Sequence, residues 1–204
     1  MTTEQAIEIL KILVNNPLLG VVIGGVMALL GNSYFQEKKR AREKKIEILE
    51  NLQMIISQLR DTLSLWCSMN IQVQFFGTAI AFDQKSHQDF LVFKEEFQRW
   101  SSSHVELSKD VIALKGEVWR NFASYKIHFG KDDKFFNLLN DFMKPSSFKP
   151  KEYKSAPNLT VLYQMQEGDM KRLNEEWEKE MQPRHSRIID YLDSKIDLLG
   201  SKTK

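Results

Sequence analysis

Two side chains that could share acid–base chemistry lie five positions apart, in the run Arg99-Trp-Ser-Ser-Ser-His104. An imidazole takes up and releases a proton near neutral pH, and a guanidinium binds phosphate oxygens with a planar fork of donors. Arg99 and His104 are therefore candidates for the cleavage of a phosphodiester bond. The structural alternative is an exposed arginine followed by a histidine at the start of a helix.

Other catalytic signatures are missing from the sequence. It contains no glycine-rich phosphate-binding loop and no nucleophile elbow, and its four histidines do not have the spacing of metal ligands. We therefore predict no metal and no cofactor. Cys67 is the only cysteine, so no disulfide can form within the chain, which agrees with a reducing compartment.

The spacing of Arg99 and His104 resembles the R-x(4–6)-H motif of HEPN domains, although Trp100 stands where that family favours a polar residue. The resemblance implies an all-α bundle and, in many members, a metal-independent ribonuclease that acts as a dimer. More loosely, the chain resembles the membrane-anchored HEPN-like accessory proteins of RNA-targeting CRISPR systems. Those proteins combine an N-terminal membrane helix with a helical bundle and assemble into a membrane pore.

Helices must position this pair, and the most distinctive predicted helix is the charge-free segment 17–36. From Leu18 to Phe35 it holds about 18 residues, which as a helix span roughly 27 Å, close to the apolar thickness of a bilayer. We predict that this segment crosses the membrane; the alternative is a buried helix of a soluble domain. Small residues recur along one face and predict contact with a second copy. These residues are Gly20, Gly24, Ala28 and Gly31.

A basic run follows this segment directly. Because positive residues stay on the cytoplasmic side, the run predicts a single-pass protein of the cell inner membrane, with its N-terminus outside and its C-terminus in the cytoplasm. The same side chains are expected to meet anionic lipid headgroups. They are Lys38, Lys39, Arg40, Arg42, Lys44 and Lys45. The chain has 29 basic and 27 acidic residues, and the excess lies in this run, so the composition does not indicate a nucleic-acid-binding surface.

The remaining sequence has helical periods and no alternating strand pattern. We predict an all-α fold in which the membrane helix continues into a long helix and a cytoplasmic helical bundle follows. The predicted divisions are 1–36, 37–83 and 84–204. Between Leu49 and Trp66, apolar residues at steps of three and four form a stripe that either joins copies of the chain or packs on later helices. Gly77 is expected to end or bend the long helix.

Later boundaries follow from capping residues. Ser103 and Glu106 form a capping box, which predicts that a new helix begins there and ends at Gly130. A short helix is predicted at 133–143 and an exposed loop at 144–157. Two final helices are predicted on either side of Pro183, because proline interrupts a helix.

These features favour a non-enzymatic, oligomeric membrane effector that disturbs or permeabilises the membrane in anti-phage defence. The expected partners are the membrane, further copies of the chain, and an RNA or protein trigger on the cytoplasmic side. Two alternatives stay open. One is a membrane-tethered, HEPN-like ribonuclease that needs no metal, and the other is a non-enzymatic anchor or scaffold for a cytoplasmic partner.

Overall fold

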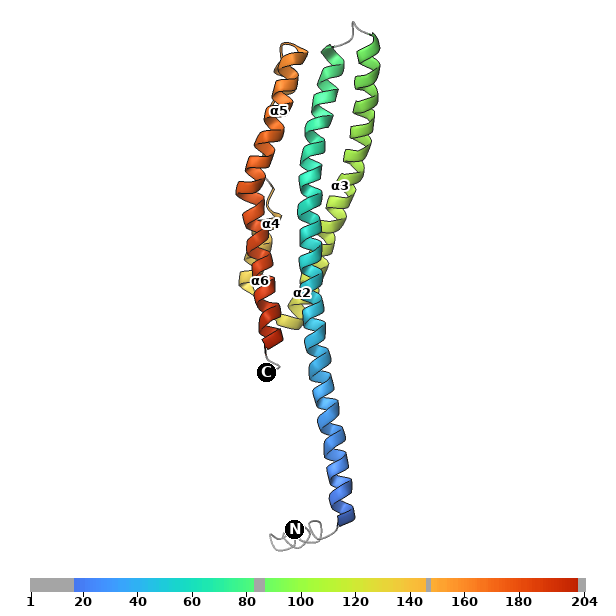
Figure 1. The fold of residues 1–204 in the computed structure, drawn as a ribbon, viewed down its shortest axis with the longest axis vertical. Coiled ribbons are helices and arrows are strands. Elements are labelled where there is room, and N and C mark those ends of the chain that lie inside the picture. The colour runs from blue at the N-terminus through green and yellow to red at the C-terminus, as the bar shows by residue number, and fades with distance from the viewer. Residues whose placement is uncertain (1–16, 83–86, 146–147, 202–204) are drawn as a thin grey trace. The chain divides into compact units, whose positions relative to one another are not determined.

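A computed structural model describes residues 17–82, 87–145 and 148–201, and for residues 17–20, 22, 23, 87 and 88 it describes the backbone alone. All regular elements in these ranges are helical, as predicted (Figure 1). They are α2 (Pro17–Phe82), α3 (His87–Phe129), α4 (Asp133–Met143), the 3₁₀ turn η1 (Tyr153–Ser155), α5 (Leu159–Glu176), the π-helical η2 (Trp177–Met181) and α6 (Gln182–Ser201). The chain divides into two compact units, Met1–Lys45 and Ile46–Lys204.

The second unit is a helical bundle with its main core between α2, α3, α4 and α6 (Figure 1). The predicted stripe of α2 supplies Leu49, Leu52, Ile56 and Leu59, all fully buried. They pack in this core, so the stripe faces later helices of the same chain. Its partners from the other three helices include Val118, Tyr125, Phe135, Leu139, Ile188 and Leu192.

A second core lies where α2 meets α5 and the segment before α5. Ile71, Phe75 and Ala79 of α2 pack there with Tyr153 and Leu162. Gly77 lies inside α2, so the helix does not end there, which was one of the two expected outcomes. A Cβ atom at Gly77 would lie 3.1 Å from the Phe97 ring of α3, so the glycine admits a close approach between the two helices.

Helix α3 runs without interruption from His87 to Phe129, so the break predicted at Ser103 is wrong. The capping box is a local preference, and a serine inside a helix can instead donate to the carbonyl four residues earlier. Ser108, further along the same helix, shows this behaviour, because its hydroxyl donates to the carbonyl of His104 at 2.7 Å. The predicted end at Gly130 is confirmed, because α3 stops there and Gly130 has a positive φ of 76°.

The helical backbone also continues through Pro183, where a break was predicted. The five residues of η2 form a π turn, and the Gln182 amide donates to the carbonyl of Trp177. A proline lacks the N–H that would bond four residues back, and its ring crowds that carbonyl. The wider π turn before Pro183 accommodates this defect without ending the helix.

The segment 148–157 is a loop with one 3₁₀ turn, as predicted, but it is not exposed along its whole length. Tyr153 is only 2% exposed and Ala156 is also buried. Both belong to the second core. The predicted helix at 133–143 is confirmed as α4, with the Asp132 side chain accepting from the Phe135 amide as its cap.

In the first unit, the described residues 17–45 are helical. Among the residues that the structure describes, no helix has both the length and the apolarity for a membrane crossing. The predicted span 17–36 includes residues 17–20, 22 and 23, whose side chains lie outside that description. The N-terminal residues 1–16 also lie outside it.

Candidate functional site

Arg99 lies on an exposed face of α3. Its Nη2 atom is 2.5 Å from Glu96 Oε2, one helical turn away, and the guanidinium lies 5.2 Å from the centre of the Trp100 ring. The same Glu96 oxygen accepts from Trp100 Nε1 at 3.0 Å. Arg99 is therefore already paired with a carboxylate and an aromatic ring of its own helix.

His104 lies at the contact between α3 and α2. Its ring stacks on Trp66 of α2, with ring centres 5.3 Å apart and an angle of 25° between the planes. Trp66 Nε1 donates to Ser108 Oγ at 2.8 Å, which strengthens the same contact. The Nε2 atom of His104 is buried and has no hydrogen-bond partner among the described residues. Burial lowers the pKa of His104, so its ring is neutral at pH 7.

The structure does not bring Arg99 and His104 together within one chain. Five positions on a continuous helix turn the side-chain direction by about 500°, which leaves the two side chains roughly 140° apart around the axis. Arg99 forms an ion pair with Glu96 on the exposed side of α3, whereas His104 lies at the contact between α3 and α2. A shared cleft between two protomers stays a prediction.

The predicted oligomerisation residues lie in the first unit. They fall within an arc of roughly 80° on α2, from the helical rotation per residue. A Cβ atom at Gly24 or Gly31 would meet nothing within 4 Å, and Ala28 is exposed. Packing within the chain therefore does not explain the two glycines, each of which lowers helix stability by about 1 kcal/mol relative to alanine. Gly20 belongs to the residues with backbone description alone.

The basic run occupies the following turns of α2. Lys38 Nζ lies 4.4 Å from the centre of the Tyr34 ring, and Lys39 pairs with Glu43 at 3.8 Å. The six predicted headgroup-binding residues are all within this helix, with Arg42 and Lys45 half-buried and the others exposed.

The bundle contains a cavity between α2, α3, the end of α4 and η2 that no sequence pattern predicts. It has a volume of about 330 Å³ and an apolar lining that includes Trp66, Phe148, Trp177 and Met181. Cys67, Asn70, Lys115 and Lys144 add polar groups to its wall. Such a site depends on residues more than a hundred positions apart, which no local pattern reveals. Burial raises the pKa of the Cys67 thiol to about 11, so it is a neutral group.

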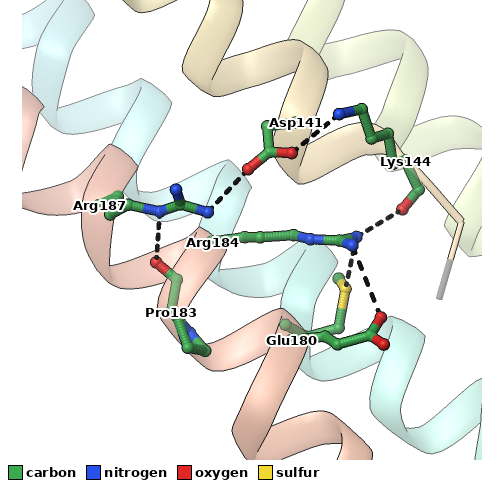
Figure 2. A network of polar contacts seen from close by, with 7 residues as sticks. Asp141, Lys144, Glu180, Pro183, Arg184 and Arg187 are labelled. Atoms are coloured by element: carbon green, nitrogen blue, oxygen red, sulfur yellow. Dashed lines mark hydrogen bonds and ion pairs between the residues drawn. The ribbon is translucent and has the colours of Figure 1, made fainter. Parts of the chain in front are cut away.

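Figure 2 shows a polar network that includes the cavity residue Lys144. Asp141 binds Lys144 Nζ at 3.0 Å and Arg187 Nη2 at 2.8 Å. Its hydrogen bond to Lys144 is the main reason that the Asp141 pKa is lowered. Arg184 reaches the Lys144 carbonyl at 3.4 Å, the Met181 sulfur at 3.8 Å and Glu180 at 3.5 Å. These contacts fix the cavity residues Lys144 and Met181 to α4 and α6.

His185 is buried in the main core with only 7% exposure. Its Nδ1 atom lies 3.3 Å from Arg60 Nη1, and its Nε2 atom lies 3.1 Å from Ser57 Oγ. Arginine can only donate, so Nδ1 accepts and the ring hydrogen is on Nε2, which donates to the serine. Burial, and then the Arg60 charge, lower the pKa of His185 against a smaller opposing effect of Asp61.

Two carboxylates fasten the connecting segments. Asp132 Oδ2 accepts from the hydroxyls of Tyr125 and Tyr191 and lies 3.2 Å from Lys195 Nζ. Burial alone would raise the pKa of Asp132, but these hydrogen bonds hold it far below its usual value. Asp169 is fully buried and accepts from the Lys151 amide at 2.7 Å, Tyr153 Oη at 2.9 Å and Arg172 Nη2 at 2.6 Å. Both carboxylates therefore stabilise the fold by holding different segments of the chain together.

In the part of the chain that the structure describes, no three His, Cys, Asp or Glu side chains gather as a metal site. The chain also matches no protein-family model, no curated protein and no solved structure. The two features of the chain that bear on its function are the exposed apolar segment of α2 and the apolar cavity of the bundle.

Proposed function

We propose that this chain is an oligomeric single-pass membrane effector, in which segment 17–36 inserts in the inner membrane and the bundle of residues 46–204 lies in the cytoplasm. The bundle acts there as a non-enzymatic regulatory domain, and self-association of the membrane segments disturbs or permeabilises the bilayer. An RNA or protein on the cytoplasmic side is the proposed trigger.

The observation that carries this proposal is the exposure of apolar side chains in a charge-free helix. Val21, Met27, Leu29 and Phe35 each expose more than two thirds of their surface. Val26, Leu30 and Tyr34 are also exposed. Removing these seven side chains from water is worth on the order of 10 kcal/mol, which is comparable to the whole stability of a domain. A bilayer supplies the apolar surroundings that this surface lacks.

The residues next to this surface support a bilayer as the occupant. Tyr34 and Phe35 stand where an aromatic belt would meet the headgroups, and the basic run that follows matches the negative charge of the cytoplasmic leaflet. The open space around Gly24 and Gly31 supports contact with a second copy, because small residues let two membrane helices approach closely.

The pairing of Arg99 with Glu96, and the packing of His104 on Trp66, favour the effector over the ribonuclease. A general base must reach the proton that it abstracts, and the neutral His104 ring is instead covered by a tryptophan.

Expression in a bacterial host with a potential-sensitive dye tests the proposal. Expression of the full chain should collapse the membrane potential, and Gly24→Ile should prevent the collapse by separating the helices. Gly25→Ile is the matched control, because it adds the same side chain one position away, about 100° around the helix, where a Cβ atom also meets nothing. An unchanged potential with the full chain, or equal effects of the two variants, would contradict the proposal.

A further inference from the structure

The cavity of the bundle has the size and lining of a small-molecule site. Its volume of about 330 Å³ is near the lower end for ligand pockets, which run from about 300 to 1,000 Å³. Trp66, Phe148 and Trp177 supply aromatic surface from three different parts of the chain. Flat, apolar molecules match such walls best, since aromatic rings pack by stacking or edge-to-face contact.

Lys115 of α3 gives this apolar lining a charge. It is half-buried, and within the described ranges no hydrogen bond, ion pair or aromatic contact involves its side chain. A partly buried ammonium group loses hydration and is stabilised when a counter-charge replaces it. None of the described residues that line the cavity is acidic, so this lining does not supply that counter-charge.

The second lysine of the lining does not compete for the same role. Lys144 is bound to Asp141 at 3.0 Å, and Asp141 is also paired with Arg187 (Figure 2). The cavity therefore combines one paired lysine with one unpaired lysine. The neutral Cys67 thiol adds no charge.

The wall formed by η2 is built by an irregular backbone. The π turn at Trp177–Met181 contributes both of its end residues to the cavity, and Arg184 holds Met181 through its sulfur atom. Single π turns inside helices occur often at functional sites. Here the turn precedes Pro183, which requires a local departure from α geometry in any case.

We propose that this cavity binds a small aromatic carboxylate, with the ring system between Trp66, Trp177 and Phe148 and the carboxylate paired with Lys115. The complementarity is one of shape and charge: an apolar space of about 330 Å³ that contains an unpaired cation and no acidic lining residue. This inference is independent of the membrane function proposed above.

A comparison of two ligands tests it. The full chain in a mild non-ionic detergent is titrated by calorimetry with naphthalene-2-carboxylate and with the neutral naphthalene-2-carboxamide, and the heat from detergent alone is subtracted. The carboxylate should bind about tenfold more tightly, because a hydrogen bond between charged groups is stronger than a neutral one. Equal affinities, or no binding of the carboxylate, would overturn the proposal. This comparison needs no variant.

Two lysine variants locate the charge. Lys115→Met should reduce the affinity for the carboxylate to that for the carboxamide. The affinity for the carboxamide should stay unchanged. Lys109→Met removes the same charge from an exposed position of the same helix and should retain the preference. A preference that survives Lys115→Met, or that both variants lose equally, would contradict the assignment to Lys115.

The single cysteine reports where the ligand binds. Cys67 lines the cavity, so naphthalene-2-carboxylate should slow its modification by N-ethylmaleimide, measured by mass spectrometry of the intact chain. Lys115→Met should abolish this protection at the same ligand concentration. Binding by calorimetry without any protection of Cys67 would place the ligand elsewhere and refute the proposed site.

Discussion

Replacing Asp169 with alanine should reduce the free energy of unfolding by about 2–5 kcal/mol, because two donors lose the buried carboxylate that accepts from them. The structure gives the components of this value. The change removes the acceptor of the Tyr153 hydroxyl and of the Lys151 amide, and an unsatisfied buried donor costs about 1–3 kcal/mol. The third partner, Arg172, is 40% exposed, so solvent reduces its share.

Urea unfolding of the full chain in a mild non-ionic detergent, followed by tryptophan fluorescence, measures this loss. Asp190→Ala is the matched control, because Asp190 is exposed on α6 and its removal should change stability by less than about 0.5 kcal/mol. Tyr153→Phe removes the orphaned hydroxyl, so the double variant should lose less stability than the sum of the two single variants. A loss at Asp169 no greater than the control, or strict additivity with Tyr153→Phe, would refute the reasoning.

The pKa of His185 is lowered in the folded state, so its stabilising effect is complete above the unfolded pKa of about 6.5 and is lost as the pH falls below that value. His185→Gln should therefore show a smaller drop in the free energy of unfolding between pH 7 and pH 5 than the original chain. An equal drop would contradict this prediction. Asp132→Ala removes a helix cap and the acceptor of two tyrosine hydroxyls, so it should lower the free energy of unfolding in urea by about 2–4 kcal/mol. Asp133→Ala breaks only an exposed ion pair and should lower it by less than about 1 kcal/mol. Similar losses in the two variants would show that the Asp132 cluster adds no stability. The double variant Arg99→Ala with His104→Ala should match the original chain in an assay of RNA cleavage, and cleavage that only the original chain performs would establish the ribonuclease.

Local signals predicted several elements because the residues that decide them lie within a few positions. Gly130 ends α3 through its positive φ, and Asp132 caps α4 three residues before the Phe135 amide. The stripe of α2 was predicted from its period alone, and the structure shows that it packs on α3, α4 and α6. Periodicity gives the apolar face of a helix without naming the partner of that face.

Local signals failed where distant contacts decide. The Ser103 capping box predicted a break, but the surrounding stretch has no glycine or proline and α3 packs along α2 through Trp66 and His104, so one long helix forms. Pro183 predicted an interruption, and the chain responds with a π turn. The cavity around Lys115 joins parts of the chain that only the fold brings together.

Alkaline carbonate extraction of membranes from cells that express the full chain tests the central claim most directly. If segment 17–36 is in the bilayer, the chain should stay in the membrane pellet, and a chain that lacks residues 1–36 should move to the supernatant. This comparison follows from the apolar surface of Val21, Met27, Leu29 and Phe35, which the truncated chain does not carry. Recovery of the full chain in the supernatant would contradict the account.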